Sequence, residues 1–151
     1  MTVFDRIAAI GVVPVVAIDN ADRAVDLANA LADGGLPIAE ITFRTDAARD
    51  AIASIAKARL DFFVGAGTVV TAQQVAQTKA AGAQFALAPG TDPAMIEAAQ
   101  AAGLPYAPGI MTPSDLQIAT RLGCRFLKFF PAGLAGGPKM LANIAAPFAH
   151  L

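Results

Sequence analysis

The sequence of 151 residues holds only one cysteine and one histidine. A single thiol, Cys124, permits no disulfide within the chain, and it is typical of proteins in a reducing compartment. The one imidazole, His150, stands close to the end of the chain, so thiolate and imidazole ligands are too few for a metal site. We therefore expect neither a disulfide nor a metal site.

Charged residues are scarce as well, at 15% of the sequence, and 11 basic against 12 acidic residues leave a net charge of -1. No cluster of lysine or arginine supplies the basic surface of a nucleic-acid-binding protein, so we expect no nucleic acid as partner. Hydrophobic residues make up 56%, but their runs are broken by glycine, proline or charge well short of the roughly 20 residues of a transmembrane helix. No basic segment followed by an apolar core marks a signal peptide. We expect a cytoplasmic protein without a membrane partner.

Short apolar runs alternate six times with alanine-rich amphipathic stretches. The runs predict strands over residues 12–18, 38–43, 62–66, 85–88, 106–108 and 126–129. Helices are predicted to begin near Asp22, Ala47, Ala72, Pro93, Pro113 and Gly137, and a further short helix over about residues 2–9. Because parallel strands need long crossovers, which are usually helical, this alternation predicts an α/β fold with a parallel sheet.

The helix ends carry local signals. Polar side chains at the starts predict these N-caps: Asp22, Asp46 and Ser114. Glycines are expected where helices stop: Gly34, Gly82, Gly103 and Gly123.

The turn after the first predicted strand is informative about the type of parallel sheet. It reads Ile18-Asp19-Asn20-Ala21, without the glycine-rich pattern of dinucleotide-binding folds, which favours a (β/α)8 TIM barrel. Six units cannot close eight strands, and such barrels usually need roughly 200 residues or more. We expect one barrel domain over residues 1–151 that covers about the first six βα units and lacks strands 7 and 8, with an open sheet as the alternative.

One lysine interrupts the last of these apolar runs. Lys128 stands between aromatic residues in the segment FLKFFPA, residues 126–132. Burial disfavours the ammonium form, and the neutral amine is the form that attacks a carbonyl to make a Schiff base. The alternative is that Lys128 packs its stem and extends its ammonium to solvent at the strand end.

Other polar residues are predicted at the same end of the sheet. Glu40 lies within the second run, Arg44 follows that run, and Thr68 ends the third. In barrels and open parallel sheets the chemistry gathers at the carboxyl ends of the strands. We therefore expect a carboxylate, a guanidinium, a hydroxyl and an amine to converge. Alternatively, Glu40 and Arg44 form a buried ion pair that only fixes the strand register.

Six segments, taken together and in this order, resemble a known family: GVVPVVAI, EITFRT, GAGTV, PGTDP, PGIMTPSD and FLKFFPA. They are similar to the 2-dehydro-3-deoxy-phosphogluconate (KDPG) aldolases, which include bifunctional 4-hydroxy-2-oxoglutarate (KHG) aldolases. The resemblance runs from about Gly11 to Phe148. It implies a class I aldolase on a (β/α)8 barrel, a lyase of carbohydrate metabolism in the Entner-Doudoroff pathway, assembled as a homotrimer without metal or cofactor.

The matched motifs also imply roles for individual residues. Lys128 matches the Schiff-base lysine, and Glu40 matches the general acid/base. Arg44 and Thr68 match residues that hold the carboxylate of the pyruvate portion. Pro89 and Phe130 match residues that form the walls around the enamine intermediate of the reaction.

The reaction implied is cleavage of 2-dehydro-3-deoxy-6-phosphogluconate to pyruvate and glyceraldehyde 3-phosphate. KHG and 2-dehydro-3-deoxy-6-phosphogalactonate are alternative substrates for the same residues. The glycine turn and serine loop that bind phosphate in the family follow the region matched by residues 147–148 and are not among these 151 residues. A non-catalytic barrel fragment that binds a ligand is the alternative of another class.

Overall fold

Helices and strands alternate along the chain in the computed structural model, which describes residues 2–148. The elements are α1 (Val3–Ile10), β1 (Val15–Val16), η1 (Ala21–Arg23), α2 (Ala24–Asp33), β2 (Ile38–Thr42), α3 (Ala48–Ala58), β3 (Phe63–Gly67), α4 (Ala72–Ala80), β4 (Ala86–Leu87), α5 (Pro93–Ala101), β5 (Tyr106–Ala107), β6 (Gly109–Ile110), α6 (Pro113–Arg121), β7 (Lys128–Phe129), α7 (Gly137–Ala145) and η2 (Ala146–Phe148). The predicted α/β class is confirmed. His150 and Met1 lie outside the described residues.

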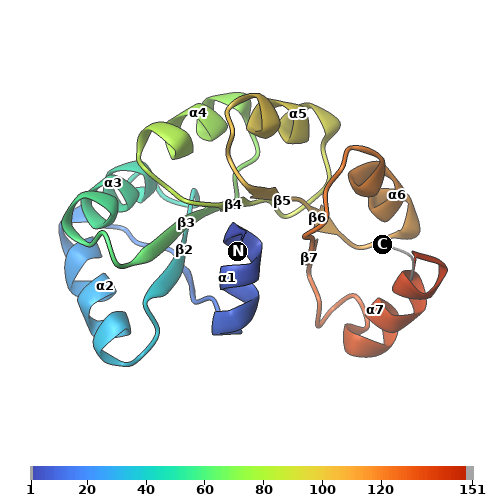
Figure 1. Cartoon of the computed structure of the whole chain (residues 1–151), viewed down its shortest axis with the longest axis horizontal. Coiled ribbons are helices and arrows are strands. Elements are labelled where there is room, and N and C mark those ends of the chain that lie inside the picture. The colour runs from blue at the N-terminus through green and yellow to red at the C-terminus, as the bar shows by residue number, and fades with distance from the viewer. Residues whose placement is uncertain (1, 149–151) are drawn as a thin grey trace.

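The strands follow one another in sequence order around the sheet. One sheet has the order β1-β2-β3-β4-β5, a second contains β6 and β7, and every pair is parallel. A doubly wound sheet would reverse its strand order at a switch point, and this one does not. Figure 1 shows the strands along an arc with α2 to α6 on its convex side. The fold is therefore a partial barrel, as expected.

The fifth predicted run, residues 106–108, matches β5, and a further short strand, β6, follows its last residue. Pro108 separates β5 from β6, because a proline has no N–H to donate to a neighbouring strand. Its carbonyl still accepts a hydrogen bond from the Lys128 N–H, at 2.9 Å, and so helps to hold β7 beside β6.

Side chains of the central strands alternate between two hydrophobic clusters. On β2, Ala39 and Ile41 pack outward against the helices. Ile38 points to the concave side, where it packs with Phe63 and Phe85. Glu40 shares the parity of Ile38, so the strand period of two carries its carboxylate to the concave side as well.

The first helix fills the hollow of the arc at the amino-terminal ends of the strands (Figure 1). A capping box between Thr2 and Asp5 starts α1, and Ile7 on its buried face packs against Ile38, Phe63 and Phe85. The Arg6 guanidinium lies 4.3 Å from the centroid of the Phe63 ring. These contacts make α1 the floor of the concave space.

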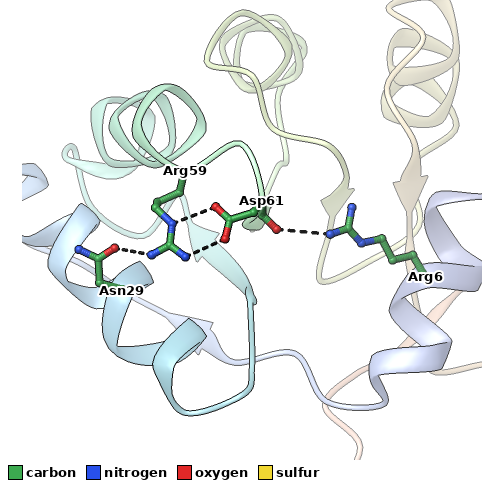
Figure 2. Close-up of polar contacts among 4 residues, drawn as sticks. All are labelled: Arg6, Asn29, Arg59 and Asp61. Carbon is green, nitrogen blue, oxygen red and sulfur yellow. Dashed lines mark hydrogen bonds and ion pairs between the residues drawn. The ribbon is translucent and has the colours of Figure 1, made fainter.

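Polar contacts tie α1 and α2 to the loop between α3 and β3, as Figure 2 shows. Arg59 donates two hydrogen bonds to the Asp61 carboxylate, at 2.9 and 2.8 Å, and a third to Asn29 on α2. Arg6 donates to the Asp61 carbonyl at 3.5 Å. The arginine beside it lowers the pKa of the Asp61 carboxyl from 3.8 to about 2.

The helix stops are confirmed, whereas the predicted N-caps are wrong. Asn20 rather than Asp22 caps the first turn after β1, and α3 starts without any side-chain cap, so Asp46 does not cap it. Thr112 caps α6 in a capping box, which places Ser114 inside the helix. A proline follows Thr112, and proline is favoured at the first helical position, so the cap belongs one residue before it.

All four glycines stand where a helix ends. Gly34 is the C-cap of α2, and the others follow a C-cap directly with φ of +85°, +60° and +82°: Gly82, Gly103 and Gly123. None of the helices within residues 2–148 has the length and apolarity that crossing a lipid bilayer requires.

Candidate active site

The side chains of Lys128 and Glu40 meet across the concave side of the partial barrel. Lys128 begins β7, Glu40 is at the centre of β2, and the lysine Nζ donates to the glutamate Oε1 at 3.2 Å. The side chains are 20% and 3% exposed, respectively. Because the Lys128 ammonium pairs with Glu40 on the concave side, the interpretation that it extends to solvent is wrong. Because the partner of Glu40 is Lys128, the interpretation of a Glu40–Arg44 ion pair is wrong too.

An aromatic ring borders this pair. The Lys128 Nζ lies 5.4 Å from the centroid of the ring of Phe130, two residues further along the chain. The Phe130 N–H donates to the Ile110 carbonyl at 3.2 Å, which anchors the ring at the carboxyl end of β7. A cation above an aromatic face is attracted by the ring quadrupole, so Phe130 helps to hold the amine in place.

Thr68 follows β3 in an unusual backbone conformation. Its φ is +56°, and it is the one non-glycine residue with a positive φ among residues 2–148. For a β-branched side chain this is a strained conformation. Such strain collects at functional sites, where the surrounding structure enforces it. Thr68 therefore stands at the carboxyl end of the strand beside Glu40, as the sequence predicts, in a strained backbone conformation.

Arg44 and Pro89 lie in exposed loops at the carboxyl ends of β2 and β4. Arg44 lines a cleft of about 530 Å³ at the starts of α3 and α4, together with Arg49 and Thr71. Within residues 2–148 it makes no hydrogen bond or ion pair, so the structure brings Arg44 to the same end of the sheet but not into contact with Lys128. Pro89 lies against β6, since a Cβ on Gly109 would overlap its backbone.

Two buried polar residues of the sheet, one at the carboxyl end of β2 and one on the outer face of β5, are absent from the sequence-based prediction. Thr42, fully buried two residues after Glu40, donates its hydroxyl to the Val16 carbonyl at 3.0 Å and joins β2 to β1. The Tyr106 hydroxyl donates to the Val69 carbonyl at 3.1 Å, and burial, with a smaller effect of the Asp92 charge, raises the pKa of Tyr106 to about 12. The period-two pattern on β2 is the signal that would have identified Thr42.

Comparisons with known proteins bear on this constellation. The family model for KDPG and KHG aldolase matches residues 3–151. The 2-dehydro-3-deoxy-phosphogluconate aldolase of Haemophilus influenzae is 42% identical over 99% of this chain and 70% of its own length. The KHG/KDPG aldolase of Escherichia coli K12 is 44% identical over 93% of this chain and 66% of its own.

A solved structure gives the same result in three dimensions. KDPG aldolase from Legionella pneumophila, with pyruvate captured as a covalent carbinolamine intermediate, superposes with a TM-score of 0.87 at 38% identity. The match covers 91% of this chain and 66% of that one, so the chain spans about two thirds of the length of these relatives. The resemblance carried by the sequence motifs is confirmed: the chain belongs to the KDPG and KHG aldolase family, lyases that act through a Schiff base.

Proposed function

We propose that the protein cleaves 2-dehydro-3-deoxy-6-phosphogluconate to pyruvate and glyceraldehyde 3-phosphate as a class I aldolase. The observation that carries this proposal is the contact of 3.2 Å between the Lys128 Nζ and the Glu40 Oε1 on the concave side. An amine needs a proton acceptor within hydrogen-bond reach before it can add to a ketone. Glu40 is that acceptor, and it has almost no contact with bulk water.

The first half of the reaction makes the Schiff base. Glu40 takes a proton from the Lys128 ammonium, and the neutral amine adds to the C2 ketone of the 2-oxo acid to give a carbinolamine. Protonation of the C2 hydroxyl lets it leave as water, and an iminium remains between Lys128 and C2. The iminium is the electron sink for the next step.

The second half breaks the carbon chain and regenerates the enzyme. The Glu40 carboxylate removes the proton of the C4 hydroxyl, the C3–C4 bonding pair moves to the iminium, and the aldehyde leaves. The enamine takes a proton at C3, and water hydrolyses the resulting iminium to release pyruvate and free Lys128. One carboxylate therefore serves as base and as acid in successive steps.

Four further residues complete the proposed site. Arg44 grips the substrate carboxylate with two parallel hydrogen bonds, and the Thr68 hydroxyl adds a third. The strained φ of Thr68 supports its inclusion. Pro89 and Phe130 form walls around the enamine, and the ring of Phe130 already lies beside the Lys128 Nζ.

Two alternative substrates use the same residues. The E. coli relative carries both KHG and KDPG in its name, which supports KHG as a second substrate. The galactonate epimer differs from KDPG in configuration only. Comparison of kcat/KM across the three substrates separates these activities.

The assembly and the compartment are also part of the proposal. We expect a homotrimer, as the resemblance to the family implies. The single cysteine is buried and free, which suits the reducing cytoplasm. Analytical ultracentrifugation measures the oligomeric state.

Borohydride trapping tests the function directly. The protein is incubated with pyruvate, reduced, and analysed by intact mass and peptide mapping, beside Lys128→Ala and Lys128→Arg. We expect a pyruvate adduct on Lys128 that is missing from both variants. If the folded wild-type protein forms no adduct, or forms it on another lysine, the mechanism is wrong and a non-catalytic binding role is favoured.

A further inference from the structure

The space that the Glu40 side chain occupies exists because the neighbouring strand has a glycine there. Gly67 ends β3, pairs in register with Thr42 and therefore faces the concave side next to Glu40. A Cβ on Gly67 would overlap the Glu40 Oε1 and would lie only 2.6 Å from Cδ and 2.7 Å from Cγ. Oε1 is also the atom that accepts the hydrogen bond from Lys128.

We propose that Gly67 is a positioning residue, which by lacking a side chain lets the Glu40 carboxylate lie along β3 and reach the Lys128 amine. This inference rests on the proposed aldolase function for its kinetic consequence. Its structural part, that the side chain at position 67 decides where the carboxylate lies, stands on the geometry alone.

The backbone of Gly67 itself does not require glycine. Its φ is not positive, so an alanine adopts this conformation without strain. The end of β3 is also held in place, because the Gly67 carbonyl accepts a hydrogen bond from the Phe43 N–H at 2.8 Å. The overlap with a new methyl group is therefore relieved by rotation of the flexible Glu40 side chain, not by movement of the strand.

Gly65, two residues earlier on the same strand, makes a different requirement. A Cβ there would overlap the ring of Phe85, which is fully buried in the cluster beneath the site. An aromatic ring in a packed core cannot rotate away without opening a cavity. Gly65 is therefore needed for packing, whereas Gly67 is needed for the position of a carboxylate.

The experiment compares Gly67→Ala with Gly90→Ala. Gly90 is also at the carboxyl end of a strand, and a Cβ there would meet nothing within 4 Å.

Three quantities are measured: borohydride-trapped adduct, exchange of the pyruvate methyl protons with solvent deuterium, and kcat and KM for KDPG. For Gly67→Ala we expect kcat and deuterium exchange to fall roughly 100-fold, the scale of general acid/base catalysis, with an almost unchanged KM. Gly90→Ala should match the wild type. Wild-type kcat and exchange in Gly67→Ala would overturn the proposal.

A thermodynamic cycle with Glu40→Ala keeps the test independent of activity. If Gly67→Ala acts by displacing the Glu40 side chain, the fall in Tm that it causes disappears once that side chain is cut back to Cβ. An equal fall in Tm in both backgrounds would overturn the positioning role. A wild-type protein without a pyruvate adduct would refute the aldolase function, while this cycle would still decide whether Gly67 positions Glu40.

Discussion

The rings of Phe4 and Phe126 are stacked, with their centroids 4.6 Å apart and an angle of 9° between their planes. Phe4 belongs to α1, and Phe126 lies two residues before Lys128 on the segment that leads into β7. Helix α1 is therefore in direct contact with the segment that carries the proposed Schiff-base lysine. The stack links the floor of the concave space to the site above it.

Removal of this stack should loosen both the floor and β7. Phe4→Ala is expected to lower the free energy of unfolding by about 2–3 kcal/mol, because a large apolar side chain is lost from a partly buried cluster. Urea denaturation measures the change. Ala8→Ser, at an exposed position of the same helix, should stay within about 0.5 kcal/mol of the wild type. Equal stability of the two variants would mean that α1 does not pack on the segment before β7 in solution.

The protein should lose stability in alkali as the unfolded tyrosine ionises. The folded-state pKa of Tyr106 is raised from 10.0 to about 12 by burial, so its contribution to stability is fully present below pH 10 and is lost as the pH rises toward 12. Tyr106 is the only tyrosine and the sequence has no tryptophan, so the tyrosinate absorbance reports this one group. We expect that absorbance to appear well above pH 10. A midpoint near 10 in folded protein would contradict the burial of the Tyr106 hydroxyl.

Replacement of Thr68 by glycine should separate stability from activity. A residue other than glycine in the left-handed region costs about 1–2 kcal/mol, and replacement by glycine removes this cost. Part of the resulting gain in stability is offset, because glycine makes the unfolded chain more flexible. Thr68→Gly is expected to raise the free energy of unfolding by about 0.5–1 kcal/mol and to reduce kcat/KM for KDPG, because the hydroxyl is gone. Thr68→Ser keeps the hydroxyl and should retain most of the activity. Lower stability of Thr68→Gly in thermal and urea unfolding would show that the positive φ is not strained.

The local features of the fold could be predicted because they depend on neighbours in sequence. The alternation of apolar runs with amphipathic stretches fixes the order of strands and helices, and a glycine at the end of a helix supports the left-handed conformation that stops it. The predicted N-caps are wrong, and for Asp22 and Ser114 the reason is a second polar residue within two positions that caps instead. Short-range signals of similar strength compete, and only the folded chain selects one.

By itself the sequence determined a parallel α/β chain with Glu40 and Lys128 on strands and Thr68 at a strand end, and its motifs determined the family. Only the tertiary structure decided which charges pair, because residues 88 apart in sequence meet through the curvature of the arc. It paired Lys128 with Glu40, left Arg44 in an exposed loop, and brought Gly67 against the glutamate. Such contacts depend on strand register and curvature, and neither is encoded in the residue types next to them.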